Sequence, residues 1–274
     1  MDFDFNLILV PATLVFFVIW LLDKLVWKQR ATRGKGNENT AIAWAYDFWP
    51  VLAVVLVVRS FIVEPFNIPS ESMLPTLETG DFILVDKSAY GVRLPLVHTR
   101  IFGDGTPERG DVAVFRYPPQ PSINYIKRVI GIAGDTVRFE NNQLSVNGQL
   151  VQTVKLSEAD IAAIAGLNQH TSTTLIDGQT VAAEFYRQQL GERSFLWRDL
   201  VDFEPPLIPE QGWEMVVPAD SYFVMGDNRD QSADSRFWGV VPDANLSGRA
   251  FYIWMHKDKG WFKLPTFSRN QSIQ

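Results

Sequence analysis

Apolar residues divide the chain into two long hydrophobic segments and a longer remainder with short alternating segments. Residues 5–22 carry no charge. As a helix they would span about 27 Å, close to the hydrocarbon thickness of a bilayer. A second apolar segment covers residues 44–63, and its charges, Asp47 and Arg59, lie near its ends, where Arg can reach the interface. The pattern predicts a membrane anchor of two transmembrane helices within residues 1–63.

The loop between the two segments, about residues 23–43, is basic. It holds five Lys and Arg residues, and such an excess marks the cytoplasmic side of a membrane. The first residues carry Asp2 and Asp4 but no cation, unlike the basic start of a cleavable signal peptide. We therefore expect a retained anchor, which in a bacterium would lie in the inner membrane. The N-terminus and everything after about residue 64 would lie on the outer, periplasmic side.

The remainder alternates short β-prone segments with turn residues. These segments are rich in β-branched and aromatic residues and are bounded by Gly, Pro and Asp. Asn147-Gly148 is a strong hairpin signal, and helices do not alternate with the strands. We predict a mainly β fold, an antiparallel sheet or barrel-like core formed by residues 64–148 and 212–274. The expected strands cover residues 81–87, 111–116, 125–132, 135–140, 213–217, 222–225 and 246–256.

Residues 149–211 differ in character from the segments on either side. They are polar and show no sustained alternation. Ser157 and Asp160 form a capping pattern that predicts a short helix, with Gly166 as its stop. We expect a less regular, inserted secondary subdomain, and no chemistry is evident in it.

Composition excludes several classes of function. There is no cysteine, so thiol catalysis, disulfides and Cys-based metal sites are excluded. The net charge is −6 and the distal part has no basic tract, which argues against nucleic acid as a partner. His98, His170 and His256 lie in no recognisable motif, and His-Glu-x-x-His is absent. We expect no metal and no cofactor.

Residues 66–77 place two serines between two prolines. Pro69 and Pro75 disfavour a helix and stiffen the chain. Side chains two residues apart on an extended chain point the same way, so Ser70 and Ser72 could present two hydroxyls to one spot. The alternative is a polar linker between the membrane and the domain.

A serine nucleophile needs a base, and Lys127 is the outstanding candidate. It lies in the expected strand 125–132, with Tyr125 and Val129 as same-face neighbours. Burial lowers the pKa of a lysine and could free its amine to accept a proton. The alternative is an edge-strand lysine that discourages aggregation. Residues 226–236 form a polar loop after another strand, either a solvated loop or part of a site.

Three stretches together resemble the signature boxes of bacterial type I signal peptidases (leader peptidases). They are residues 68–77 (IPSESMLPTL), 125–128 (YIKR) and 226–236 (GDNRDQSADSR). Residues 59–61, 64–66, 80–85 and 109–112 fit further segments of that family. The resemblance covers about residues 59–140 and 213–256, and Glu71 stands where the family often has a small residue. It implies a membrane-bound serine endopeptidase that uses a Ser/Lys dyad.

The resemblance also implies roles for individual residues. Ser72 would be the nucleophile and Lys127 the general base, while the Ser70 hydroxyl and the Ser72 N–H would form the oxyanion hole. Ser232 would orient the Lys127 amine. The residues expected to brace this machinery are Asp234, Arg236, Asp227 and Arg128.

The implied substrates are secreted preproteins, cut after a signal peptide at an Ala-x-Ala-like site. From their spacing, the apolar residues expected to line shallow pockets for small side chains are Phe66, Ile68, Met73 and Phe82. The expected partners are these preproteins, the lipid bilayer and the secretion translocon. Two alternatives stay open: a non-enzymatic β-domain such as a secretion adaptor, and a Ser/Lys peptidase that cuts itself or one dedicated client.

Overall fold

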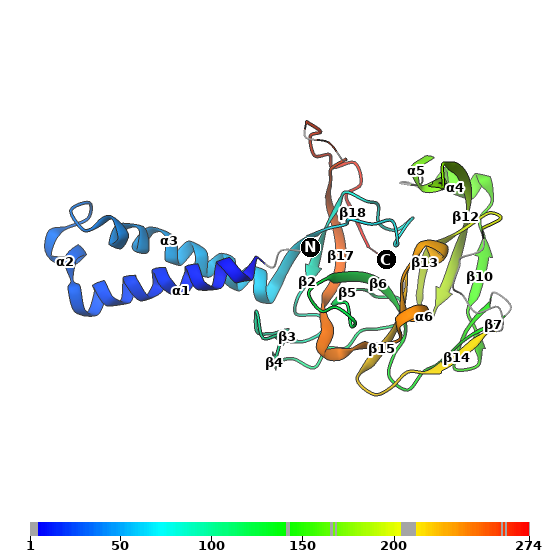
Figure 1. Ribbon diagram of the computed structural model, residues 1–274, viewed down its shortest axis with the longest axis horizontal. Coiled ribbons are helices and arrows are strands. Elements are labelled where there is room, and N and C mark those ends of the chain that lie inside the picture. Colours follow the sequence, from blue (N-terminus) through cyan, green and yellow to red (C-terminus); the bar gives the residue numbers. More distant parts are fainter. Residues whose placement is uncertain are drawn as a thin grey trace.

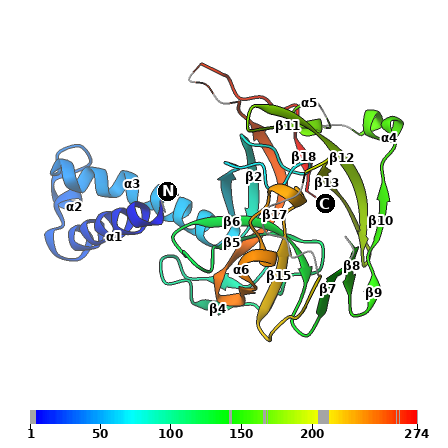
Figure 2. The same ribbon diagram turned by 45° about the vertical axis from the view of Figure 1, so that its right-hand side comes forward.

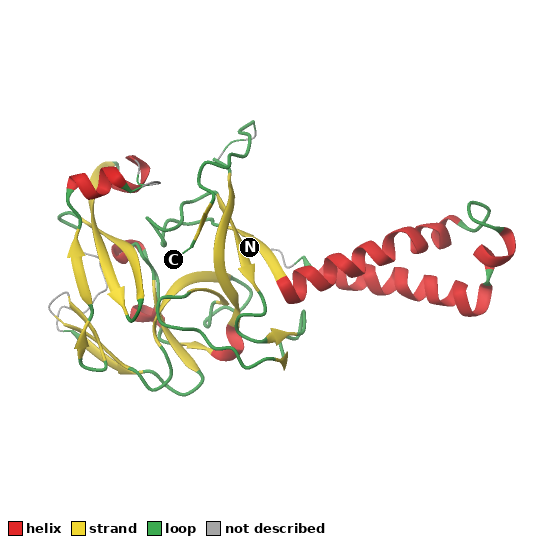
Figure 3. Ribbon diagram, turned by 180° about the vertical axis from the view of Figure 1, so that it is seen from behind, coloured by secondary structure: helices red, strands yellow, loops and turns green. Residues whose placement is uncertain are grey.

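A helical hairpin projects from one side of a β-rich body (Figure 1). The computed structural model describes residues 5–140, 143–164, 167, 169–203, 212–258, 260 and 262–273. Seen from behind, the hairpin consists of two long antiparallel helices joined by a short helical turn and a loop (Figure 3). The fold is mainly antiparallel β, as the sequence predicts.

The hairpin consists of two apolar helices that are each long enough to cross a membrane. Helix α3 begins where the Asn39 side chain accepts a hydrogen bond from the Ala41 N–H (2.9 Å). Aromatic rings join the helices, with Trp20 and Trp49 at a centroid distance of 4.9 Å. The helical segments are α1 (Asn6–Leu22), η1 (Asp23–Trp27), α2 (Gln29–Arg33), α3 (Thr40–Val57) and η2 (Val58–Ile62).

The central sheet follows directly from the second helix. Its strand order is β1-β2-β17-β5-β6-β15-β16, with β18 paired to β17. Neighbouring strands pair antiparallel throughout. The strands are β1 (Val63–Asn67), β2 (Asp81–Asp86), β5 (Val112–Arg116), β6 (Asn124–Gly131), β15 (Ser221–Met225), β16 (Val241–Pro242), β17 (Leu246–His256) and β18 (Gln271–Ser272).

Strand β6 is the centre of the packing. Its residues Ile126, Val129 and Ile130 each belong to a different one of three hydrophobic clusters. Residues 126–131 are buried because both faces of the strand are covered. A buried strand fixed by three clusters is a rigid support for functional side chains.

Two smaller sheets flank the central one. The Asn147-Gly148 turn joins β8 to β9, and both turn residues have positive φ (54° and 74°), as the sequence signal requires. The flanking strands are β14 (Trp213–Val216), β7 (Thr136–Glu140), β8 (Gln143–Val146) and β9 (Gln149–Leu150), together with the pair β3 (Val92–Arg93) and β4 (Arg100–Phe102).

The segment 149–211 is more regular than its sequence suggests. The long strands β12 and β13 pair as a hairpin that stands beside the central sheet (Figure 2). Polar residues such as Gln188 and Arg198 are buried in it, so hydrophobic alternation is weak and the sequence conceals the strands. The expected capping box of Ser157 and Asp160 is confirmed, while Gly166 lies outside the described residues. The elements are β10 (Gln152–Lys155), α4 (Glu158–Ala163), α5 (Gln169–Ser172), β11 (Thr173–Ile176), β12 (Gln179–Leu190) and β13 (Arg193–Leu200).

Candidate active site

The two serines lie in a tight turn that begins three residues after β1. We call residues 70–77 the serine turn. The Leu77 N–H donates to the Met73 carbonyl oxygen (3.0 Å), so this stretch turns rather than extends. The hydroxyl oxygens of Ser70 and Ser72 nevertheless lie 3.4 Å apart. Ser72 is buried, whereas Ser70 and Glu71 are exposed.

Strand β6 brings Lys127 to Ser72. The Lys127 amine donates to Ser72 Oγ (2.6 Å) and to the carbonyl oxygen of Ile126 (3.0 Å). The side chain is buried, and Nζ lies 5.3 Å from the centroid of the Tyr125 ring. The lysine is therefore a central-strand residue, and the alternative of an aggregation-blocking edge lysine is wrong.

The surroundings of Lys127 favour its neutral form. Burial lowers the pKa of the amine from 10.5 to about 8, although Asp234 and Asp227 act in the opposite direction. Arg236 adds to the lowering. Because a neutral amine can accept a proton, part of the population can act as a base near neutral pH.

Arg128, the next residue on β6, faces the other side of the sheet and is paired. Its guanidinium donates twice to the carboxylate of Asp227 (2.8 and 2.7 Å) and once to the Gly110 carbonyl oxygen (2.8 Å). The same carboxylate accepts a hydrogen bond from the Thr76 hydroxyl (2.5 Å). Asp227 therefore fastens the serine turn to β6.

The polar loop 226–236 contacts the backbone of the serine turn. The Asn228 N–H donates to the Ser72 carbonyl oxygen (3.1 Å), and its amide nitrogen donates to the Glu71 carbonyl oxygen (3.0 Å). A Cβ on Gly226 would lie 2.4 Å from the Ser72 carbonyl oxygen. Only glycine allows this approach.

Asp234 and Arg236 are joined by hydrogen bonds within the loop, and their supporting role in the site stays a prediction. Arg236 donates twice to the Asp234 carboxylate (2.8 and 2.9 Å), and the Gly226 N–H donates to it as well (2.9 Å). Burial alone would raise the pKa of Asp234. Arg236 and the Gly226 N–H outweigh it, so the pKa lies below its ordinary value. The carboxylate stays charged at the pH where Lys127 titrates.

Ser232 is placed differently from expectation. It is buried beside Gly226, and the hydrogen bonds that the structure gives the Lys127 amine go to Ser72 and Ile126. Its hydroxyl instead helps to lower the pKa of Asp234. An orienting role toward Lys127 stays a prediction.

The four expected pocket residues divide into two pairs. Ile68 and Met73 are almost fully buried in the hydrophobic cluster beneath the serine turn, so they support the turn and do not line an open pocket. Phe66 on the edge strand β1 and Phe82 on the neighbouring strand β2 are half-buried, and the Phe82 ring packs edge-on against Trp254. Only this second pair stays a candidate for contact with substrate.

Two further contacts of the loop were not anticipated from sequence. Arg229 is buried and donates to the Gln188 side chain on β12 (2.6 Å), and burial lowers its pKa to about 10. The Arg198 N–H on β13 donates to the Asp227 carbonyl oxygen (2.8 Å). The insertion therefore touches the same loop that holds the serine turn. No local sequence pattern indicates these contacts.

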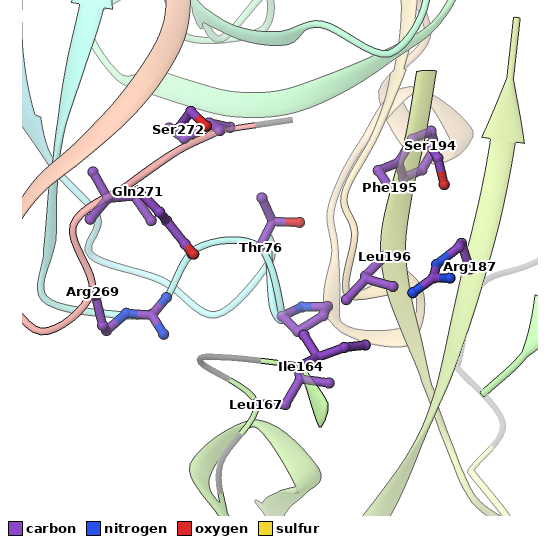
Figure 4. Close-up of a pocket in the computed structure, with 13 residues that line it drawn as sticks. Thr76, Ile164, Leu167, Arg187, Ser194, Phe195, Leu196, Arg269, Gln271 and Ser272 are labelled. Atoms are coloured by element: carbon purple, nitrogen blue, oxygen red, sulfur yellow. The ribbon is translucent and has the colours of Figure 1, made fainter. Parts of the chain in front are cut away.

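A cleft of about 520 Å³ opens between the serine turn, the C-terminal strand and the insertion (Figure 4). Thr76 lies at its centre, with Arg269 and Gln271 on one side and Leu196 on the other. Phe195, which also lines it, contacts the Arg128 guanidinium (4.1 Å to the ring centroid). The cleft therefore lies on the Arg128 side of β6, away from the Ser72–Lys127 contact.

Comparisons with known proteins identify the class of the chain. Residues 41–255 match the family described as "Signal peptidase, peptidase S26". A signal peptidase I of Pseudomonas aeruginosa is 40% identical, covering 98% of each chain. One of Pseudomonas fluorescens is 38% identical, also covering 98% of each. A crystal structure of a signal peptidase I from Enterococcus faecalis is 26% identical, with a TM-score of 0.28, covering 53% of this chain and 96% of that one.

These relationships make the chain a peptidase. It belongs to the S26 signal peptidase family. The resemblance seen in its sequence is confirmed at the level of the family, whereas the roles of single residues stay predictions.

Proposed function

We propose that the chain is an inner-membrane endopeptidase that cleaves signal peptides from preproteins, with Ser72 as nucleophile and Lys127 as general base. The observation that carries this proposal is the 2.6 Å contact between Lys127 Nζ and Ser72 Oγ. Burial, which lowers the pKa of Lys127 to about 8, supports the assignment of the base. The names of the relatives, signal peptidase I, support the substrate class.

In the first step the neutral Lys127 amine takes the proton from Ser72 Oγ as this oxygen attacks the scissile carbonyl. The resulting ammonium then protonates the leaving amine, and the acyl group remains on Ser72. Lys127, neutral again, takes a proton from water as the water oxygen attacks the acyl carbonyl. The ester bond to Ser72 Oγ then breaks, the carboxylic acid leaves, and the Lys127 ammonium returns its proton to Ser72 Oγ.

The oxyanion would be held by the Ser72 N–H and the Ser70 hydroxyl. The short separation between the two serine hydroxyls supports this assignment, because a donor must lie near the carbonyl that Ser72 attacks. One donor of this kind typically contributes about 10²- to 10³-fold to kcat.

The substrate would bind as an extended strand at β1. This strand ends the central sheet, so its outer edge is available within the described residues, and edge strands bind peptides by backbone hydrogen bonding. Phe66 would contact the small side chains of an Ala-x-Ala-like site. Phe82 pairs opposite Asn67, so its ring lies on the other face of the sheet. The basic loop 23–43 supports placing this edge on the outer side of the membrane, where the bilayer and the secretion translocon are the expected partners.

The test is cleavage of a purified signal-bearing precursor by the detergent-solubilised full chain and by Lys127→Ala. We expect the wild type to release the mature protein and the variant to release none at equal amounts of folded protein. Normal cleavage by Lys127→Ala would overturn the proposed base. A panel of unrelated precursors separates a general processing enzyme, which cuts most of them, from a peptidase dedicated to one client.

A further inference from the structure

The insertion contains a buried arginine with no counter-ion in contact. Arg198 on β13 is 0% exposed, and no ion pair joins it to a carboxylate among the residues that the structure describes. Its guanidinium donates to the Thr171 carbonyl oxygen (2.7 Å), the Thr174 hydroxyl (2.7 Å) and the Gln231 side-chain oxygen (3.1 Å). A buried, unpaired cation is costly, so these neutral acceptors are the partners that define its place.

The contact with Gln231 connects the insertion to the polar loop. The Gln231 side-chain oxygen accepts hydrogen bonds from Arg198, from the Thr174 hydroxyl (3.3 Å) and from the Asn228 amide nitrogen (3.1 Å). A guanidinium can only donate hydrogen bonds, so the side-chain oxygen of Gln231, and not its amide nitrogen, must face Arg198. The amide orientation of Gln231 then determines the direction of the Asn228 side chain.

Asn228 holds both peptide units that flank the Ser72 Cα. Its side chain donates to the Glu71 carbonyl oxygen, and its backbone N–H donates to the Ser72 carbonyl oxygen. The Glu71 carbonyl and the Ser72 N–H belong to one planar, trans peptide unit. Fixing the oxygen of that unit therefore fixes the direction in which the Ser72 N–H points.

We propose that Arg198 is a positioning residue for the oxyanion hole, acting through Gln231 and Asn228 on the Ser72 N–H. This inference rests on the proposed function, because it assumes that the Ser72 N–H stabilises an oxyanion. It gives the insertion a part in the reaction.

Arg198→Lys tests the proposal while keeping the positive charge. A single ammonium on a flexible stem cannot reproduce the fixed fork that joins three acceptors. We expect kcat for precursor cleavage to fall about 10- to 100-fold, because a donor displaced by about 1 Å loses most of its effect. KM should change less than about twofold. The inflection in the pH profile should stay in place, since the contacts of Lys127 are untouched.

Arg187→Lys is the matched control. Arg187 lies on the paired strand β12, directly opposite Leu196, and its side chain is exposed. Its kinetics should equal those of the wild type. An Arg198→Lys enzyme with wild-type kcat, or with a loss confined to KM, would overturn the proposal.

Gln231→Ala provides a second test if Arg198→Lys does not fold. Gln231 is partly exposed, and its removal should lower kcat without changing KM. Where both variants fold, the double variant should lose no more than the worse single one, because both interrupt the same path. If the fold losses in kcat of the two single variants multiply in the double variant, the two residues do not act along one path.

Ser72→Ala in the same assay distinguishes failure of the positioning role from failure of the proposed function. If Ser72→Ala is inactive while Arg198→Lys and Gln231→Ala behave as wild type, the positioning role is wrong and the proposed function stands. If Ser72→Ala retains cleavage, the proposed function fails and the positioning role fails with it.

Discussion

Lys127 and Arg128 are neighbours on β6, and the structure treats these two buried cations in opposite ways. Lys127 hydrogen-bonds two uncharged oxygens, those of Ser72 and Ile126. Arg128 lies on the other face and donates two hydrogen bonds to the Asp227 carboxylate. Their side chains point to opposite sides of the sheet because successive residues of a strand alternate.

This difference decides which of the two side chains can exchange a proton. An arginine cannot release its proton in a protein, so a paired Arg128 can only hold Asp227 and the serine turn. A lysine without a close carboxylate has a lowered pKa and can exchange its proton. One strand therefore carries both the proposed base and the arginine that holds Asp227.

Replacing Lys127 with methionine should have the largest effect on activity. Cleavage should fall by about 10⁴- to 10⁶-fold, as when other members of a nucleophile–base unit are removed. Stability should rise by up to about 3 kcal/mol at pH 7, because burial lowers the pKa of Lys127 from 10.5 to about 8 in the folded chain.

Paired denaturation and cleavage assays of the full chain in detergent check both halves of this prediction. The folded-state pKa is the lower one, so the cost of the charged amine is fully present below pH 8. It disappears as the pH rises toward 10.5. The stability gain of Lys127→Met should disappear with it. A marked loss of stability at pH 7 would show that the lysine also has a structural role.

Arg128→Met should give the opposite result, with stability as the main loss. It leaves the buried Asp227 carboxylate without its cation, which typically costs about 3–5 kcal/mol. Chemical denaturation followed by tryptophan fluorescence measures the change. A cost under about 1 kcal/mol would contradict the bracing role, and the contrast with Lys127 would then be lost.

Ser70→Ala tests the chemical side of β6 without disturbing the brace. We expect kcat to fall by about 10²- to 10³-fold with little change in KM, because a hydroxyl donor to the oxyanion is lost. Ser70→Thr retains a hydroxyl and serves as the control. Equal kcat in Ser70→Ala and wild type would remove Ser70 from the oxyanion hole.

The pH profile gives the smallest expected change. Below pH 8 the charged form of Lys127 dominates, so kcat/KM should rise about fifty-fold between pH 6 and 8 and then level off. Arg128 cannot contribute an inflection in this range. A flat profile between pH 6 and 9 would argue against a lysine base.

Local patterns in the sequence predict much of this structure. The apolar segments and the alternation along β2, where Ile83 and Val85 are buried, identify helices and strands without knowledge of the fold. Ser72 and Lys127 are candidates from the sequence alone, but only the family resemblance favours their pairing over the alternatives, because 54 residues separate them in the chain and no local pattern encodes that contact.

Other features depend on tertiary packing. Ile68 and Met73 are apolar at plausible spacing, but sequence cannot distinguish a pocket wall from a core residue. Gln188 and Arg198 are buried through hydrogen bonds rather than apolar contacts. The usual signal for strands is therefore missing around them.

The junction between the second long helix and the catalytic sheet has a mechanical consequence. Strand β1 begins at Val63, immediately after η2 ends at Ile62, and Glu64 binds both Arg59 and Lys87 across this junction. No loop residue lies between η2 and β1. In a bilayer, such a joint would hold Ser72, the proposed nucleophile, at a nearly constant height above the lipid, so a peptide bond held higher or lower would not be cut. The anchor would thus set the height at which a peptide bond is cut, in addition to attaching the chain to the membrane.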